Sequence, residues 1–83
     1  MIMLRLKIVS PERIEFDGEV DSVKVPGMAG SFEILTDHAP IISSLDKGVV
    51  EYAVSGGEKA LLDIQGGFVE VQKNVVSLCV EIK

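Results

Sequence analysis

The 23 residues from Pro26 to Gly48 read PGMAGSFEILTDHAPIISSLDKG. They set turn-forming residues such as Gly27, Gly30 and Pro40 among seven large apolar side chains, an unusual mixture for a loop. Gly and Pro redirect the backbone where other residues would be strained. The stretch therefore predicts short strands joined by tight turns, with some apolar side chains facing a partner instead of the core.

Apolar and polar residues alternate on both sides of this stretch, as they do in half-buried strands. Pro11 breaks the first alternating segment, because proline has no N–H to give to a strand ladder. Gly56-Gly57, Gln65-Gly66-Gly67 and Lys73-Asn74 are predicted turns between later segments. The predicted strands occupy residues 2–9, 14–17, 20–25, 32–34, 41–45, 50–54, 60–64, 68–71 and 76–83.

One irregularity is visible in the alternation. Gly18 permits a bend after the short segment at Ile14, and the apolar positions then slip by one residue between Val20 and Val23. A slip of one residue would turn the apolar set outward, so we expect a bulge or a strand break near Asp21 or Ser22.

The whole pattern predicts an all-β fold. No window of about 11 residues carries apolar positions at helical spacing, so no long helix is expected. About eight to ten short strands with turns every 8 to 12 residues favour a two-layer β-sandwich or flattened barrel. Residues 1–83 are predicted to form this single domain, with a thin core for so short a chain.

Composition excludes several functions. The chain is 47% hydrophobic with a mean hydropathy of +0.36, which favours folding over disorder. Its net charge of −5 offers no basic patch for nucleic acid. No apolar run approaches the roughly 20 residues that cross a bilayer, and the start does not resemble a signal peptide. We expect no membrane insertion and, with one cysteine, a reducing compartment.

No pattern in the sequence indicates catalysis or metal binding. His38 is the only histidine, so it lacks partners for a triad or a zinc site, and a hydrogen bond to its own loop is the simplest role. The acidic positions from Glu12 to Asp21 fail the EF-hand pattern and are read as a solvated face. The glycines lack a phosphate-loop context, and Cys79 lacks a basic neighbour. We expect no cofactor, no metal and no active site.

Apolar surface is the remaining candidate. Leu35, Ile41 and Ile42 flank Pro40 in a chain with a thin core. An exposed apolar cluster on a small domain marks a binding face. From sequence alone, these residues fit the core and an interface equally well. The aromatic residues Phe16, Phe32, Tyr52 and Phe68 are expected to alternate mostly as core.

Together, several motifs resemble the N-terminal domain of the epsilon subunit of the F-type ATP synthase, over essentially all 83 residues. The His-Ala-Pro element, followed by Leu-x-x-Gly and then Gly-Gly-Phe-x-Glu-Val, is more specific than any of its parts. The motifs are Val25-Pro-Gly27, Gly30-Ser-Phe32, Ile34-Leu-Thr-Asp-His-Ala-Pro40, Leu45-Asp-Lys-Gly48, Gly66-Gly-Phe-Val-Glu-Val71 and Asn74-Val-Val76.

The resemblance implies a β-sandwich and a non-catalytic role. Such a subunit sits in the rotating central stalk, clamps the gamma subunit to the c-ring, and couples proton transport to ATP synthesis elsewhere in the complex. It would be a peripheral protein on the cytoplasmic face of the bacterial inner membrane. The alternative left open is a stand-alone module that binds protein or carbohydrate.

The resemblance also implies two binding sides. Gly30, Ser31 and Phe32 would lie toward the c-ring loops, and Ser31 stands where the family carries Glu, so Glu33 is the candidate for any charge pairing with the ring. The side toward gamma would hold His38, Pro40, Ile41, Ile42 and Ser43. Related subunits usually continue into a C-terminal helical hairpin, which inhibits ATP hydrolysis and in some members binds ATP. We expect no hairpin, inhibitory switch or nucleotide site in this chain.

Overall fold

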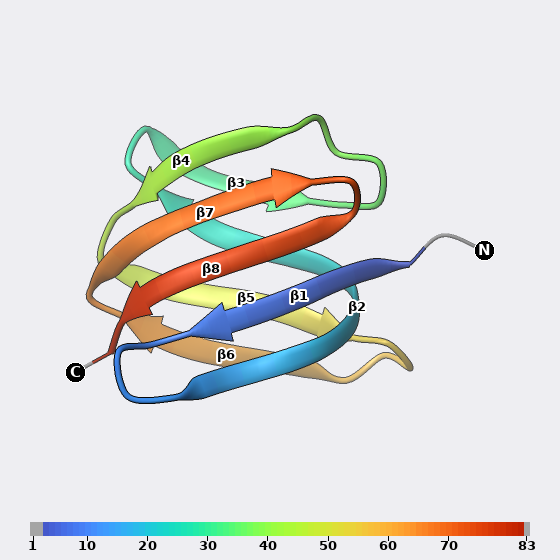
Figure 1. Ribbon diagram of the computed structural model, residues 1–83, viewed down its shortest axis with the longest axis horizontal. Helices are drawn as coiled ribbons and strands as arrows, with labels where there is room; N and C mark the ends of the chain where they lie inside the picture. The colour runs from blue at the N-terminus through green and yellow to red at the C-terminus, as the bar shows by residue number, and fades with distance from the viewer. Residues whose placement is uncertain (1–2, 83) are drawn as a thin grey trace.

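The computed structural model describes residues 3–82, and all of its regular structure is strand (Figure 1). This confirms the all-β prediction. Two residues at the ends of predicted strands, Ile2 and Lys83, lie outside the described residues. The strands are β1 (Leu4–Val9), β2 (Ile14–Gly27), β3 (Gly30–Ile34), β4 (Ile41–Leu45), β5 (Gly48–Val54), β6 (Lys59–Ile64), β7 (Gly66–Gln72) and β8 (Val75–Glu81).

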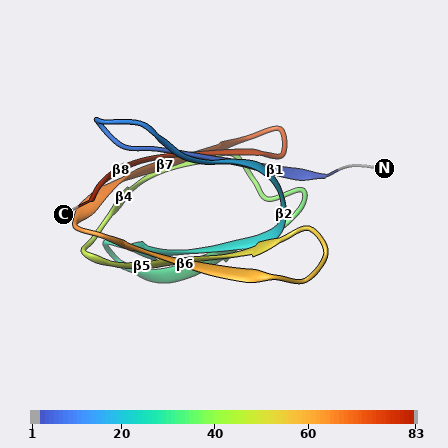
Figure 2. The same ribbon diagram turned by 90° about the horizontal axis from the view of Figure 1, so that it is seen from below.

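The strands form two facing layers, as Figure 2 shows. The upper sheet pairs β1, β8, β7 and β4 in that order, and the lower sheet pairs β3, β2, β5 and β6. Among the strands of residues 3–82, only β1 and β8 run parallel, and the other pairs are antiparallel. β4 meets the lower sheet through the single pair Leu45 and Gly27. The result is the predicted flattened sandwich and not a closed barrel.

β2 belongs to both layers. Its residues from Ile14 to Val20 pair with β1, and those from Val20 to Lys24 pair with β5. The register shifts between Val20 and Ser22, which makes Asp21 the extra residue of a bulge. The predicted irregularity is thus confirmed. The prediction of two separate strands is wrong, because the chain stays extended through Gly18 and finds a partner in each layer.

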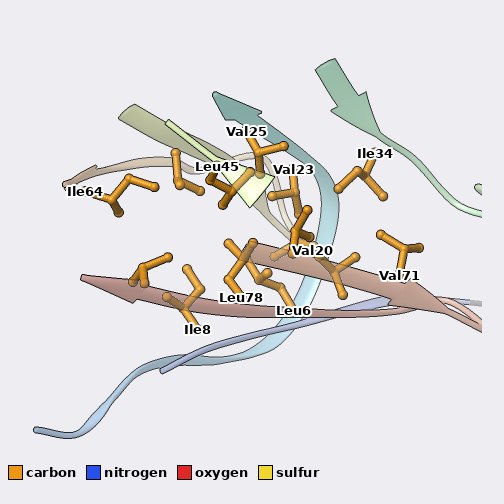
Figure 3. Close-up of a cluster of buried hydrophobic side chains, with 14 of the residues drawn as sticks. Leu6, Ile8, Val20, Val23, Val25, Ile34, Leu45, Ile64, Val71 and Leu78 are labelled. Carbon is orange, nitrogen blue, oxygen red and sulfur yellow. The ribbon is translucent and has the colours of Figure 1, made fainter. Parts of the chain in front are cut away.

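The core lies between the layers and is wholly aliphatic among the fully buried residues (Figure 3). Leu6, Ile8 and Leu78 come from the upper sheet, and Val23 and Val25 come from the lower sheet. No polar or charged side chain of residues 3–82 is fully buried. Burial of each such aliphatic side chain stabilises the fold by about 1.5–3 kcal/mol, so these contacts hold the two sheets together.

Two of the predicted turns form as expected. Gly56 and Gly57 have φ angles of 107° and 101°, and Lys73 and Asn74 have φ angles of 52° and 63°. The predicted turn at Gln65-Gly66-Gly67 is wrong in part, because β7 already begins at Gly66. A Cβ on Gly67 would clash with the carbonyl oxygen of Cys79, so only glycine lets β7 approach β8 here.

Candidate functional site

The outer face of the upper sheet carries an apolar patch. Strand alternation turns Ile42 of β4 and Phe68 of β7 outward, where they are 75% and 48% exposed. Val9 of β1 and Cys79 of β8 lie on the same face and are half-buried. We call these four residues the outer pad.

Strand register makes the outer pad continuous. Phe68 lies opposite Cys79 on β8, and Cys79 lies beside Val9 on β1. On the other side, Phe68 lies opposite Ser44, two residues from Ile42 on β4. Diagonal neighbours of this kind are within reach of an aromatic side chain. The pad therefore crosses the whole upper sheet, from β4 to β1.

Two open hollows flank the pad. One, of about 390 Å³, is lined by Pro40, Ile41, Ile42, Glu70, Val71 and Gln72. The other, of about 410 Å³, is lined by Val9, Ser10, Pro11, Gly67, Phe68, Cys79, Val80 and Glu81. Both are shallow surfaces with apolar and acidic residues side by side. A partner with matching apolar side chains and basic groups at the edge fits such a surface better than a small molecule does.

The loop beside the pad is held by the tip of the β7–β8 hairpin. The Asn74 Oδ1 accepts a hydrogen bond of 2.6 Å from the Asp37 N–H, and the Asn74 Nδ2 donates one of 3.3 Å to the Asp37 Oδ1. Asp37 has a φ of 66°, a conformation that Asp tolerates better than most residues. These contacts set the path of the chain into His38 and Pro40.

His38 has the local role that the sequence predicts. Its Nδ1 lies 2.8 Å from the Ala39 carbonyl oxygen, which can only accept, so this nitrogen donates. The ring also lies 6.4 Å from that of Phe32. The imidazole is half-buried against the loop, and these contacts hold it in place there.

The residues predicted to face the gamma subunit divide between two sides of β4. Ile42 points outward, whereas Ile41 and Ser43 are half-buried on the inner side, and Ile41 packs against the core. Pro40 is exposed and lines one hollow together with Ile41 and Ile42. The sequence did not decide whether Leu35, Ile41 and Ile42 belong to the core or to the surface. In the structure, Leu35 and Ile42 are exposed, at 51% and 75%.

The residues predicted to face the c-ring lie on β3, in the other layer. Gly30, Ser31 and Glu33 are exposed. Phe32 is half-buried and packs against the core, close to the backbone of Gly27. The structure therefore presents the two predicted sides on different sheets, joined by the loop 35–40.

Phe68 is the main residue that sequence reasoning missed, and its prediction as core is wrong. It shares strand parity with Glu70 and Gln72, opposite to the buried Val69 and Val71. That parity is readable from the sequence and could have placed the ring outside. Phe16, Phe32 and Tyr52 are half-buried and pack against the core, as expected.

Of the five acidic residues from Glu12 to Asp21, four are exposed as predicted, Glu15 is half-buried, and two form ion pairs. Arg5 contacts Asp17 at 2.9 Å, and Arg13 contacts Glu15 at 3.1 Å. Hydrogen bonds from the Ser10 hydroxyl, at 2.9 Å, and from Arg13 lower the pKa of Glu15 below its ordinary value. The pair of Arg5 and Asp17 is exposed, and such pairs contribute little to stability. The Glu15 side chain is only 15% exposed, so its pair with Arg13 is partly shielded from solvent.

Residues 3–82 contain no group of three or more His, Cys, Asp or Glu side chains placed to hold a metal ion. None of their segments is a helix long and apolar enough to cross a membrane.

Comparison with known proteins assigns the family. The model of the β-sandwich domain of the ATP synthase delta/epsilon chain matches residues 3–82. The chain belongs to this family. Among curated relatives, the ATP synthase epsilon chain of Leptospira interrogans serovar copenhageni is 45% identical over 76 residues, which cover 90% of this chain. That of Chlorobium limicola is 40% identical over 77 residues, which cover 93% of this chain and 88% of the relative.

The chain spans only part of several relatives. It covers 58% of the Leptospira epsilon chain. The fold also matches a chain in the Euglena gracilis mitochondrial ATP synthase structure of OSCP, F1 and c-ring, with a TM-score of 0.89 and 22% identity, over 94% of this chain and 50% of that one. A chain in the central stalk and c-ring structure from Tetrahymena thermophila matches with a TM-score of 0.78 and 17% identity, over 96% of this chain and 64% of that one. At these identities the likeness concerns the fold.

Proposed function

We infer that this chain is a non-catalytic rotor subunit of a proton-translocating F-type ATP synthase, where it clamps the gamma subunit to the c-ring. Family membership and epsilon chains at 40–45% identity support the inference. The observation that carries it is the outer pad, an apolar band across the upper sheet in which Ile42 and Phe68 are exposed, which has the character of a protein interface.

The outer pad is the side proposed to bind gamma. Ile42 and Phe68 supply its most exposed apolar area, and Pro40 extends it along the loop. Large apolar side chains at the centre of a contact with polar groups around them supply most of the binding energy in protein interfaces. The loop and β4 are held in place beneath this surface by His38, Ile41 and Ser43.

The tip of the lower sheet is the side proposed to face the c-ring. Gly30 and Ser31 follow the tight β2–β3 turn, and Glu33 adds an exposed carboxylate to this edge. A carboxylate there favours basic or polar groups on the ring loops. The chain would thereby be a peripheral protein at the cytoplasmic face of a bacterial inner membrane, attached through the complex.

A sandwich is suited to this mechanical role. The strands are joined by backbone ladders, and β2 runs from one layer to the other as a single strand. A load applied at the pad therefore reaches the β3 tip through hydrogen bonds and packed aliphatic side chains, not through a flexible loop. The chain's contribution would be stiffness, with the chemistry of ATP synthesis carried by other subunits.

Co-purification tests the proposal. Membranes that contain a tagged copy of the chain are solubilised in mild detergent, and the captured proteins are identified by mass spectrometry. We expect the gamma and c subunits to be recovered with the tagged chain. Capture of the chain without either subunit, from membranes whose ATP synthase is intact, would contradict the proposal.

A further inference from the structure

β6 is a sheet edge with one free side. Within residues 3–82 it pairs only with β5. The Val54 N–H donates to the Glu58 carbonyl at 2.6 Å, so this residue pair is hydrogen-bonded. Hydrogen-bonded and non-bonded pairs alternate along an antiparallel ladder. It follows that Lys59, Leu61 and Asp63 direct their backbone N–H and C=O groups away from β5.

The side chains of the same three residues share one face. Lys59, Leu61 and Asp63 all lie on the outer side of the lower sheet, and Leu61 is 69% exposed. A free backbone edge beside an exposed leucine is a template for another strand. Charged residues normally protect such an edge by repulsion. Here the two charges are of opposite sign and lie symmetrically about Leu61.

We propose that β6 pairs with β6 of a second copy of this chain, antiparallel about a two-fold axis at Leu61. In that register Leu61 lies opposite its own copy, and Lys59 lies opposite the partner's Asp63. Asp63 likewise lies opposite the partner's Lys59. All three pairs belong to the hydrogen-bonded class, so the contact forms about six ladder hydrogen bonds. Opposite charges directly across a ladder add to its stability.

The charge pattern selects a second copy over other strands. When two copies of Lys59-Ala-Leu-Leu-Asp63 pair antiparallel, a positive and a negative charge meet at each end, as a two-fold interface requires. β3, another strand with a single partner, carries Glu33 as its only charge and offers no such match. Within the chain, Lys59 contacts Glu51 at 3.2 Å on the same outer face, and its side chain is still 68% exposed. This inference concerns the free chain and does not rest on the proposed rotor function.

Sedimentation equilibrium of the free chain tests the pairing. The contact is small, so we expect a monomer–dimer equilibrium with a Kd on the order of 0.1 mM. Leu61→Pro removes an N–H that points away from β5, which a sheet edge tolerates. By symmetry the dimer then loses two hydrogen bonds, so its Kd should rise roughly thirtyfold. Leu61→Thr keeps the N–H, so its increase in Kd should be several-fold smaller than that of Leu61→Pro.

Exchange of the two charges is a second test of the β6 pairing. Lys59→Asp sets like charges across the axis and should weaken the dimer, and the added change Asp63→Lys should restore it. Circular dichroism and thermal melting confirm that each variant is folded. A wild-type chain that stays monomeric at about 1 mM, a double variant that fails to recover the dimer, or a dimer lost on Phe68→Asp would each overturn the proposal.

Discussion

Asn74 links two parts of the candidate surface. It stands in the tight turn between β7 and β8 with a φ of 63°, and its side-chain amide contacts Asp37, 37 residues away in the chain. Asn suits both tasks, because its short side chain tolerates this conformation and carries a donor and an acceptor. The residue thus places the loop with His38 and Pro40 against the upper sheet.

Replacement of Asn74 tests this role. Asn74→Gly accepts the positive φ, so its effect isolates the lost side chain. We expect a loss of stability of about 1 kcal/mol, together with faster hydrogen exchange at the Asp37 amide. Lys73→Gly, at the neighbouring turn position, is the control and should leave that amide protected. Unchanged exchange at Asp37 in the Asn74 variant would contradict the role.

Tyr52 gives the fold a measurable pH dependence. Burial, and secondarily the negative charge of Glu15, raise the pKa of Tyr52 above its ordinary value. Its ring packs 4.7 Å from that of Phe16. The folded state therefore favours the neutral phenol. The resulting contribution to stability is present below the ordinary pKa of about 10 and is lost as the pH rises through the higher folded value.

Tyrosinate absorbance reports the titration of the Tyr52 phenol directly, because Tyr52 is the only tyrosine. The native chain should titrate at a higher pH than the chain in denaturant, and Glu15→Gln should reduce the difference without abolishing it. Equal midpoints in the native and denatured chains would show that Tyr52 is not shielded from water.

At the scale of elements, β2 decides how the two layers are joined. Its bulge at Asp21 changes the side-chain parity once, so that Val20 and Val23 both face the core. The slip in alternation predicted this bulge from the sequence. The continuity of β2 through Gly18 was not predicted, because it depends on partners in both layers that local patterning does not reveal.

Deletion of Asp21 tests the bulge. Without the extra residue, one half of β2 must shift its register and turn its valines away from the core. We expect a loss of about 3 kcal/mol or more in the free energy of unfolding, measured in denaturant. Asp21→Ala keeps the residue count at this exposed position and should change the stability by no more than about 0.5 kcal/mol. Similar stabilities for the two variants would contradict the assignment.

The start of β7 at Gly66 is another feature that the sequence pattern did not predict. A Gly-Gly pair is typical of a turn, yet here β7 has already begun. Gly67 is required because β8 passes too close for any Cβ. That close approach comes from the pairing of two strands and not from the local conformation alone. Assigning turns from glycine pairs therefore does not reveal the steric requirements between paired strands.

At the scale of the whole molecule, the sandwich presents different surfaces on its two sheets. The upper sheet carries the outer pad, and the lower sheet carries charged residues around Leu61 and the β3 tip. Sequence reasoning placed Ile42 in the candidate interface but could not separate it from Ile41. Adjacent isoleucines face opposite sides of a strand, and only the pairing of β4 with β7 decides which one is outside.

The most direct test compares matched apolar positions on the two sheets in binding to the gamma subunit. Ile42→Asp and Leu61→Asp change side chains of similar exposure, 75% and 69%, on opposite sheets. Calorimetric titration should show that Ile42→Asp weakens binding by roughly 2 kcal/mol or more, while Leu61→Asp binds as the unmodified chain does and both variants keep their β-type circular dichroism. Equal binding by the Ile42 variant and the unmodified chain would contradict the assignment of the outer pad as the gamma-binding face.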